Sequence, residues 1–262
     1  MENKEIYDIE IKESDQIVDL SDCELESVSI KIAAELNYFG KIKGIFKVKN
    51  IDIFVCHKSS AKINIIADDK ETELFFRAMV FDDAKLDINF VDFAKENHKI
   101  SANLVLFGKN AECSWNLSCL SSGKDYKKYN VSFNHIGEHS TSVMNNYGVA
   151  ANNSTLLFDG VSHIEKMAGK SNASQTAKII IYDDGCRAMA NPILKIDNND
   201  ISASHAAAVG TLNEDHVFYL LSRGIDIKNA RKLITLGYLT NIFTEFSDED
   251  KQLLDSMLGE RL

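Results

Sequence analysis

The stretch Asp82-Asp83-Ala84-Lys85-Leu86-Asp87-Ile88-Asn89-Phe90-Val91 shows the pattern that decides the fold. A polar turn leads into a short run of apolar and polar residues, as in a strand with a buried face. Three later stretches also follow an apolar run and begin a strand: Lys109-Asn110-Ala111-Glu112-Cys113, Glu138-His139-Ser140-Thr141-Ser142 and Asp184-Gly185-Cys186-Arg187-Ala188. Their offsets of roughly 27, 29 and 46 residues are typical of a solenoid.

Strand-like text extends from roughly Ile42 to Ile201 and contains little helical periodicity. Small polar residues, as in Ser140-Thr141-Ser142-Val143 and Ser202-Ala203-Ser204, suit the inner stacks of a β-helix. The pattern therefore favours a mainly β protein with a parallel β-helix core. A β-sandwich is the alternative that the pattern leaves open.

After Gly210 the sequence predicts helices. Asn213 and Asp226 are expected N-caps, Gly224 suits a left-handed C-terminal position, and Gly237 is expected to end the second helix. Ser247, with Asp250 three residues later, resembles a capping box for a last helix. We therefore divide the chain into a β-helix core, 1–210, which includes a short N-terminal lead-in, and a C-terminal helical subdomain, 211–262. The subdomain is too small to bury a core alone, so it either caps the open end of the solenoid or forms a docking surface.

Composition and charge restrict the partners. The 262 residues are 45% hydrophobic, and the formal net charge is −10. Such an acidic chain gains nothing from the phosphate attraction that drives nucleic-acid binding, and an anionic membrane would repel it. The five cysteines form no Cys-x-x-Cys motif, which fits a reduced, cytoplasmic protein. The charged start of the chain does not resemble a signal peptide, and no apolar run is long enough to span a bilayer.

Catalytic motifs fail on inspection. Gly169-Lys170-Ser171 resembles the end of a phosphate-binding loop, but Ile164 stands where the loop needs a glycine. Cys113 and Cys119 do not have a standard zinc spacing, and no catalytic triad can be assigned. We therefore expect a protein without an ATPase site of its own, and not an enzyme.

His205 is the residue that the sequence singles out. It follows Ser204 near the end of the last predicted strand, just before the change from strand to helix, and its neighbours are small. Small neighbours leave room for a ligand or a second chain. A purely structural histidine is the alternative.

The stretch from His135 to Leu239 resembles the SufB/SufD family of iron–sulfur cluster assembly scaffolds. The motifs that carry the resemblance, in order and spacing, are Phe158-Asp159-Gly160, Ala173-Ser174-Gln175, Asn191-Pro192-Ile193-Leu194, Ser204-His205, Val209-Gly210, Phe218-Tyr219-Leu220, Ser222-Arg223-Gly224-Ile225 and Ala230. The resemblance implies a right-handed β-helix, which pairs core to core with a SufB-like chain or with a second copy. It also implies helices that dock SufC, an ABC-type ATPase.

The resemblance also implies functional residues. A transient iron–sulfur cluster would assemble at the subunit interface, and His205 stands where SufD-type chains supply a histidine. The cysteine of SufB-type chains falls at about Ala177, which makes the chain SufD-like, and Cys186 is a weaker substitute as a ligand. The family's long N-terminal helical region is short or missing. The residues expected to bind the ATPase are Phe218, Tyr219, Arg223, Ile227 and Leu233.

The prediction is therefore a non-enzymatic scaffold that holds a transient cluster and docks an ATPase. A β-helix enzyme and a purely structural adaptor are the alternatives. A β-helix enzyme that acts on polysaccharides or transfers acyl groups usually needs clustered carboxylates or an intersubunit histidine. The missing secretion signal counts against a polysaccharide-acting enzyme, and the missing strict six-residue repeat counts against an acyl-transferring one.

Overall fold

The computed structural model of the protein describes residues 6–261, in which sixteen strands form two eight-stranded sheets. One sheet holds the odd-numbered strands and the other the even-numbered strands, and every strand pairing among the described residues is parallel. The odd sheet contains β1 (Ile6–Ile11), β3 (Ser27–Ile32), β5 (Asn50–Val55), β7 (Thr72–Val80), β9 (His98–Leu106), β11 (Tyr126–His135), β13 (Thr155–Ile164) and β15 (Arg187–Ile196). The even sheet contains β2 (Val18–Asp19), β4 (Asn37–Lys43), β6 (Ser60–Ile66), β8 (Lys85–Asp92), β10 (Glu112–Ser121), β12 (Thr141–Ala150), β14 (Asn172–Ile181) and β16 (Ser202–Thr211).

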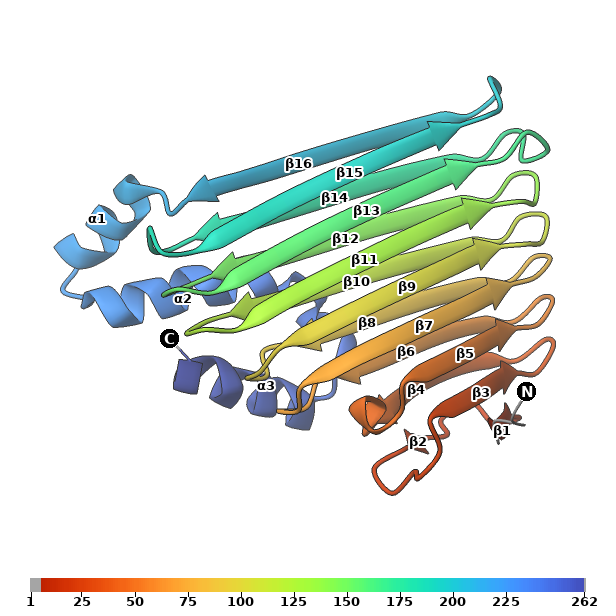
Figure 1. Cartoon of the computed structure of the whole chain (residues 1–262), viewed down its shortest axis with the longest axis horizontal. Coiled ribbons are helices and arrows are strands. Elements are labelled where there is room, and N and C mark those ends of the chain that lie inside the picture. Colours follow the sequence, from red (N-terminus) through yellow and green to blue (C-terminus); the bar gives the residue numbers. More distant parts are fainter. Residues whose placement is uncertain (1–5, 262) are drawn as a thin grey trace.

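The two sheets are the opposite walls of one β-helix. In Figure 1 the chain rises from red to blue, while the odd strands in front run to the right and the even strands behind run to the left. This is a right-handed coil, the hand expected for parallel strands joined by crossovers. The predicted β-helix is confirmed, and the β-sandwich is wrong because its sheets would be antiparallel. Strands also begin much earlier than the predicted Ile42, since β1 starts at Ile6.

The coils lengthen along the chain, which explains why the repeat is loose. Stacked partners are 23 residues apart at Ser27 and Asn50, and 32 residues apart at Asp159 and Asn191. The strands grow accordingly, from six residues in β3 to ten in β15.

The corner before each long even strand repeats one backbone conformation. A residue with positive φ stands two positions before each even-numbered strand from β4 to β14. These residues are Glu35, Lys58, Asp83, Asn110, His139 and Lys170. In each case from Lys58 onward its N–H donates to a carbonyl of the following coil, as from Asp83 to Lys109 at 2.9 Å and from His139 to Gly169 at 2.9 Å. Gly169-Lys170-Ser171 is therefore a solenoid corner. The strand start predicted at Asp184-Gly185-Cys186-Arg187-Ala188 is confirmed, since β15 begins at Arg187. This stretch is not a fourth copy of the same corner, because it lies at the opposite corner and precedes an odd strand.

Inward side chains stack in columns, because register partners in neighbouring parallel strands face the same side. One such column on the even sheet, which we call the central column, consists of Ile63, Ile88, Trp115, Met144, Gln175 and His205. Most of the interior is apolar and dense. Trp115 stacks on Phe90 with ring centroids 5.8 Å apart, and Tyr129 meets Phe158 edge-on at 5.8 Å. The central column becomes polar only in its last two members.

The helices follow the strands: α1 (Glu214–Ser222), α2 (Ile227–Leu239), the 3-10 turn η2 (Thr240–Glu245) and α3 (Asp248–Arg261), while the 3-10 turn η1 (Ile45–Lys47) lies in the first coils. The predicted caps are confirmed: Asn213 accepts from the N–H of Asp215 at 2.8 Å, and Asp226 accepts from that of Asn229 at 3.0 Å. Gly224 has a φ of 82°. Gly237 does not end the second helix, which continues to Leu239. No helix within residues 6–261 combines the length and apolar character needed to cross a membrane.

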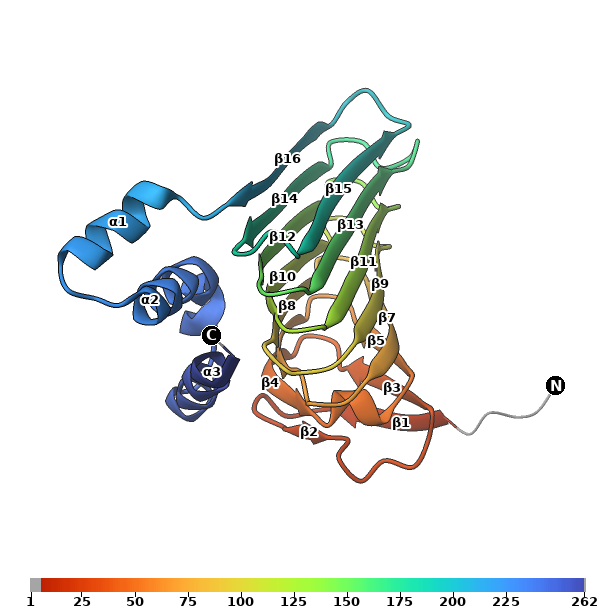
Figure 2. The same cartoon turned by 60° about the vertical axis from the view of Figure 1, so that its left-hand side comes forward.

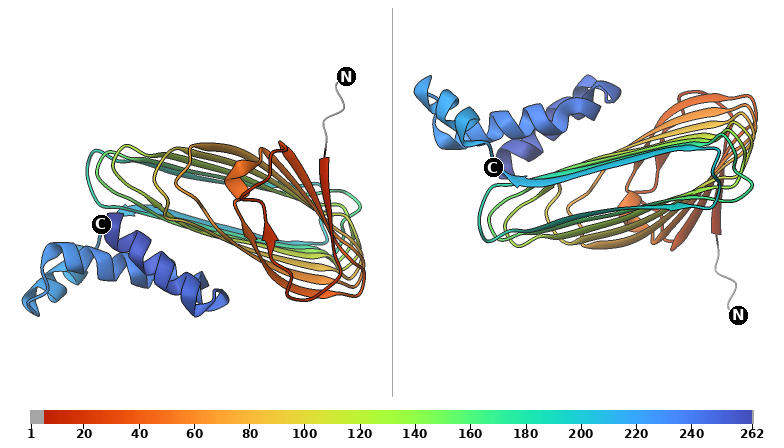
Figure 3. Two further views of the ribbon diagram at one scale, coloured as in Figure 1. Left: turned by 90° about the horizontal axis from the view of Figure 1, so that it is seen from below. Right: turned by 90° about the horizontal axis from the view of Figure 1, so that it is seen from above.

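The helices lie along the outer face of the even sheet and do not cap the open end of the solenoid (Figures 2 and 3). The expectation of an end cap is therefore wrong. The apolar contact between helices and sheet includes Ile66, Val91, Phe93, Leu120 and Val149 from the sheet side, and Leu239, Phe243, Leu254 and Leu258 from the helices. Polar contacts fix the same interface: Lys62 pairs with Glu245 at 2.6 Å, Lys41 pairs with Asp250, and Tyr182 bonds Thr235 at 2.5 Å.

Candidate functional site

The last coil of the β-helix is open. β15 and β16 are the end strands of their sheets, and no further strand within residues 6–261 pairs with them. The side chains of β16 are exposed except at Ala203, which is half-buried. Pro192 lies in β15, as expected for a residue that lacks an N–H and is tolerated at a sheet edge. Two ten-residue strand edges therefore offer unpaired backbone groups at one end of the molecule, where another chain can pair.

His205 lies on this open coil, and its side chain belongs to the inward face. Its register partner is Gln175 of β14, whose side chain is buried in the interior, so the two side chains point to the same side of the sheet. No further coil covers His205, so the imidazole is exposed, and it has no hydrogen-bond partner among the described residues. An uncommitted imidazole at an open edge is available to bind a metal or a second chain.

Cys186 and Ala177 do not complete a site with His205. Cys186 lies at the corner before β15, where its thiol donates to the carbonyl of Asn152 at 3.3 Å. His205 lies near the far end of that coil, on the order of 20 Å away along the strand direction at about 3.3 Å per residue. Ala177 faces the interior and brings no ligand. Within residues 6–261 no group of three or more His, Cys, Asp or Glu side chains is placed to hold a metal ion.

The predicted docking residues all lie on α1, on α2 and on the turn between them. α1 buries none of its residues, and Figure 2 shows it held away from the β-helix. Phe218 is 74% exposed and Tyr219 is 57% exposed, while Ile227 and Leu233 of α2 are each about half exposed. Arg223 lies over the ring of Tyr219 at 5.3 Å. We call these five residues the α1–α2 face. Such a concentration of exposed apolar side chains is typical of a protein-binding surface.

A buried ionic network in the middle of the β-helix escaped the sequence analysis. The carboxylate of Asp92 accepts hydrogen bonds from Lys127 at 2.5 Å and from Tyr129, and His98 lies 2.6 Å from the same carboxylate. Burial alone raises the pKa of Asp92, but attraction to Lys127 and His98 outweighs it and holds this pKa well below its ordinary value. Burial raises the pKa of the nearby Cys119 thiol to about 12, so this cysteine is inert. The network is enclosed and serves as structure.

One signal of the network was present in the sequence. Tyr129, Val131 and Phe133 alternate with polar residues, and the same two-residue period places Lys127 inside. Its partner Asp92 comes from another coil, and the sequence alone did not supply that pairing.

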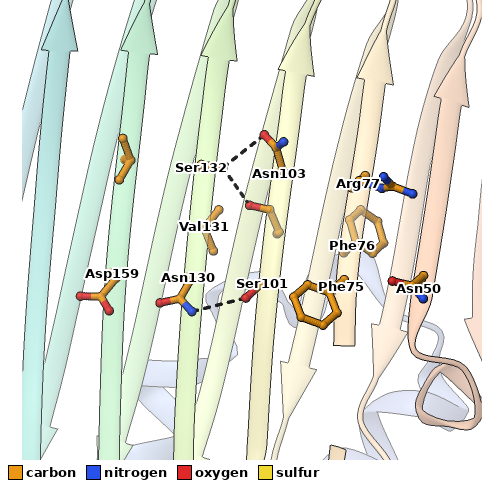
Figure 4. A pocket seen from close by; sticks show the side chains of 12 residues that line it. Asn50, Phe75, Phe76, Arg77, Ser101, Asn103, Asn130, Val131, Ser132 and Asp159 are labelled. Carbon is orange, nitrogen blue, oxygen red and sulfur yellow. Dashed lines mark hydrogen bonds between the residues drawn. The ribbon is translucent and has the colours of Figure 1, made fainter. Parts of the chain in front are cut away.

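A groove of about 510 Å³ lies on the outer face of the odd sheet (Figure 4). Its polar side chains bond each other across the strands, as Asn130 does to Ser101 at 3.4 Å and Ser132 to Asn103 at 3.3 Å. Arg77 beside the groove forms a double hydrogen bond with Asp52. These side chains satisfy one another, as expected for a solvated sheet face.

The comparison with family profiles gives one match that covers most of the chain. Residues 26–238 match the family described as "SUF system FeS cluster assembly, SufBD core domain". The match includes β3 to β16, α1 and nearly all of α2.

Individual relatives agree with this match. The chain is 34% identical to the iron–sulfur cluster assembly protein SufD of Bacillus subtilis over 134 residues, which are 50% of this chain and 31% of the relative. It is 29% identical to an iron–sulfur cluster assembly SufBD family protein of Synechocystis over 161 residues, 60% of this chain and 33% of the relative. It is 28% identical to SufD of Escherichia coli over 107 residues, 40% of this chain and 25% of the relative. Each of these matches spans a third or less of the relative's length.

Proposed function

The chain belongs to the SufBD core domain family of iron–sulfur cluster assembly, and from that premise we propose that it is a non-enzymatic scaffold subunit. In this role it holds a nascent iron–sulfur cluster for a limited time and docks an ABC-type ATPase of the SufC kind, which supplies the energy. The cluster is cargo that is built and passed on. The observation that carries the proposal is the uncommitted, exposed imidazole of His205 on the inner face of the open coil.

His205 would be one ligand of the cluster, and a second chain would bring the others. Iron–sulfur clusters take thiolate ligands, and imidazole replaces thiolate in some of them. A histidine ligand makes the cluster easier to release than one held by cysteines alone, which suits transfer. Because Cys186 lies at the far corner of the coil, it is not proposed as a partner of His205 within one chain.

Pairing would occur through the open edges of β15 and β16. Their unpaired backbone groups can extend both sheets into a second β-helix, either a SufB-like chain or an identical copy. The absence of a cysteine at Ala177 favours the SufD-like role, in which the partner supplies thiolates. The free thiols of all five cysteines fit a reducing compartment, for which we propose the cytoplasm.

The ATPase would dock on the α1–α2 face. α2 and α3 are fixed to the β-helix, so a force applied to α1 by a moving ATPase would be transmitted to the scaffold. The exposed aromatic and arginine side chains of this face are the types that dominate binding energy at interfaces.

Anaerobic reconstitution with iron and sulfide tests the cluster role. The assembled complex should develop visible-region cluster absorbance, and His205→Ala should reduce it by several fold. His163→Ala is the matched control, because His163 is a partly exposed histidine whose ring already pairs with Asp197 at 2.8 Å. Equal absorbance in the wild type and in His205→Ala would remove His205 from the cluster site, and no absorbance in any form would contradict the scaffold role.

A further inference from the structure

His98, at the start of β9, is a fully buried histidine whose two ring nitrogens both face hydrogen-bond acceptors. Its Nδ1 lies 2.6 Å from a carboxylate oxygen of Asp92, and its Nε2 lies 3.0 Å from the backbone carbonyl oxygen of Lys70. A neutral imidazole has one N–H and one nitrogen that only accepts. A ring with one proton would therefore leave a lone pair against an acceptor, whichever nitrogen carried the proton.

The carboxyl group of Asp92 does not supply the missing proton. It also accepts hydrogen bonds from the ammonium group of Lys127 at 2.5 Å and from the hydroxyl of Tyr129. Burial alone raises the pKa of Asp92, but attraction to Lys127 and His98 outweighs it and holds this pKa well below its ordinary value. Asp92 is therefore an ionised acceptor at neutral pH.

The donors and acceptors of the network balance only when His98 carries two protons. The three N–H groups of Lys127 have three acceptors: the Asp92 carboxylate and the backbone carbonyls of Asp92 at 3.4 Å and Ala94 at 2.7 Å. Tyr129 uses its one hydrogen on Asp92. The acceptors that face the two nitrogens of His98 then require a hydrogen on each nitrogen.

The charged groups around His98 offset a positive ring. Asp92, at the end of β8, lies against the ring, and electrostatic attraction also joins His98 to Asp68 in the corner between β6 and β7. The cations on the neighbouring elements are Lys127 of β11 and Lys47 of η1, of which Lys47 acts on Asp68. Two carboxyl groups therefore face the two cationic side chains His98 and Lys127.

We infer that His98 is an imidazolium in the folded protein at neutral pH, and that its second proton is a pH-sensitive lock on the corner formed by residues 67–71. Through this proton the ring joins the carbonyl of Lys70 to the carboxylate of Asp92. When the proton is lost as the pH rises, a lone pair faces one of these acceptors and the corner is released. The unfolded chain gives up the same proton near about pH 6.5, so stability falls as the pH rises above that value.

NMR of the ring nitrogens tests the protonation of His98 without any cluster or partner. At about pH 7.5 an ordinary exposed histidine is mostly neutral. His98 in the wild type should instead carry a hydrogen on both nitrogens, and these signals should be missing from His98→Gln. A single hydrogen on the His98 ring at this pH would overturn the inference, and that result needs no variant to fold.

Hydrogen exchange tests the lock itself. The amide of Thr72 donates to the carbonyl of Asn97 at 3.0 Å beside the locked corner, and that of Asn153 donates to Gly123 at 3.0 Å at a later corner. Between about pH 7.5 and about pH 10 the protection of the Thr72 amide should fall by at least about tenfold, as the loss of a hydrogen bond from a charged group implies, while that of Asn153 should stay constant.

Two variants separate the lock from a general effect of pH. In His98→Gln the Thr72 amide should have the lower protection at both pH values. His163→Gln is the matched control, because it removes a partly exposed histidine–aspartate pair, and it should behave like the wild type. Equal protection of Thr72 at both pH values in the wild type would overturn the lock.

Discussion

At the scale of single residues, the buried charges are where the fold is most sensitive. Asp92 and Lys127 are both fully enclosed, and each depends on the other for neutralisation. A buried ion pair adds little compared with an apolar pair, but removal of one partner leaves a charge without compensation.

Lys127→Met should therefore lower the free energy of unfolding by about 3–5 kcal/mol. The measurement is urea denaturation followed by circular dichroism. Lys128→Met is the matched control on the same strand, because Lys128 is partly exposed and pairs with Asp159 at 3.2 Å. Its loss should cost less than about 1 kcal/mol. Similar costs for both variants would mean that the interior network is not ionic.

His135 makes stability depend on pH. Its ring lies inside the β-helix between the hydroxyls of Ser140 and Ser142, at 2.8 Å from each. Burial lowers the pKa of His135 to about 4, below the ordinary value near 6.5. Between these values the unfolded chain binds a proton that the folded chain does not, so stability falls as the pH is lowered through this window.

The free energy of unfolding should fall by about 2 kcal/mol between pH 7 and pH 5 from this group alone. Urea titrations at several pH values measure it. His135→Gln should flatten the dependence, whereas His163→Gln should retain it. An unchanged slope in His135→Gln would show that His135 is not the cause.

The residue scale also shows what a sequence can and cannot predict. His205 was predicted from its small neighbours and from a family resemblance, and it is exposed at the open coil. Its register partner Gln175 was not predicted, because the two residues are 30 positions apart and only the pairing of β14 with β16 brings them side by side. The same holds for Asp92 and Lys127, which are 35 positions apart.

At the scale of elements, the helices combine a fixed part and a free part. α2, η2 and α3 bury apolar residues against the even sheet, whereas α1 buries none. The caps at Asn213 and Asp226 were predictable because capping chemistry is local. The side of the β-helix that the helices cover was not predictable. It depends on apolar residues at outward-facing positions of β8, β10 and β12, and the alternation of residues along a strand does not show what packs against them.

Phe218→Asp should weaken ATPase binding by at least about tenfold, since a buried aromatic anchor contributes about 2 kcal/mol or more to an interface. The β-helix should remain folded, because Phe218 contributes nothing to its core. Co-purification with the SufC-type ATPase and calorimetric titration measure the effect. Phe107→Asp is the control, because Phe107 is half exposed at a distant corner of the solenoid. Unimpaired binding by Phe218→Asp would remove α1 from the docking surface.

At the scale of the whole molecule, the β-helix has two different ends. The first coils are short, whereas the last coil presents two ten-residue edges with exposed Met189, Ile193, Ile196 and Val209. A parallel β-helix was predictable from recurring turns and strands. The number of coils was not predictable, because the coil length increases from 23 to 32 residues along the chain and the repeat has no fixed period.

Pairing of two chains through the open coil, formed by β15 and β16, should be sensitive to a charge placed there. Val209→Asp, on β16, should weaken association with a SufB-like chain or with itself by about tenfold or more, as burial of an unpaired charge implies. Light scattering across a concentration series measures it. Ile17→Asp is the control, because Ile17 is also an exposed apolar residue but lies beside β2 in the first coils. Equal association of both variants would exclude the β15–β16 end as the interface.

We propose that this chain is a scaffold that holds a cluster and docks a separate ATPase. Native mass spectrometry under anaerobic conditions, on the chain co-expressed with a SufC-type ATPase and reconstituted with iron and sulfide, tests both parts at once. We expect a complex that contains this chain, the ATPase, iron and sulfide, and that loses its iron and sulfide in His205→Ala. Recovery of this chain alone, without ATPase or iron, would contradict it.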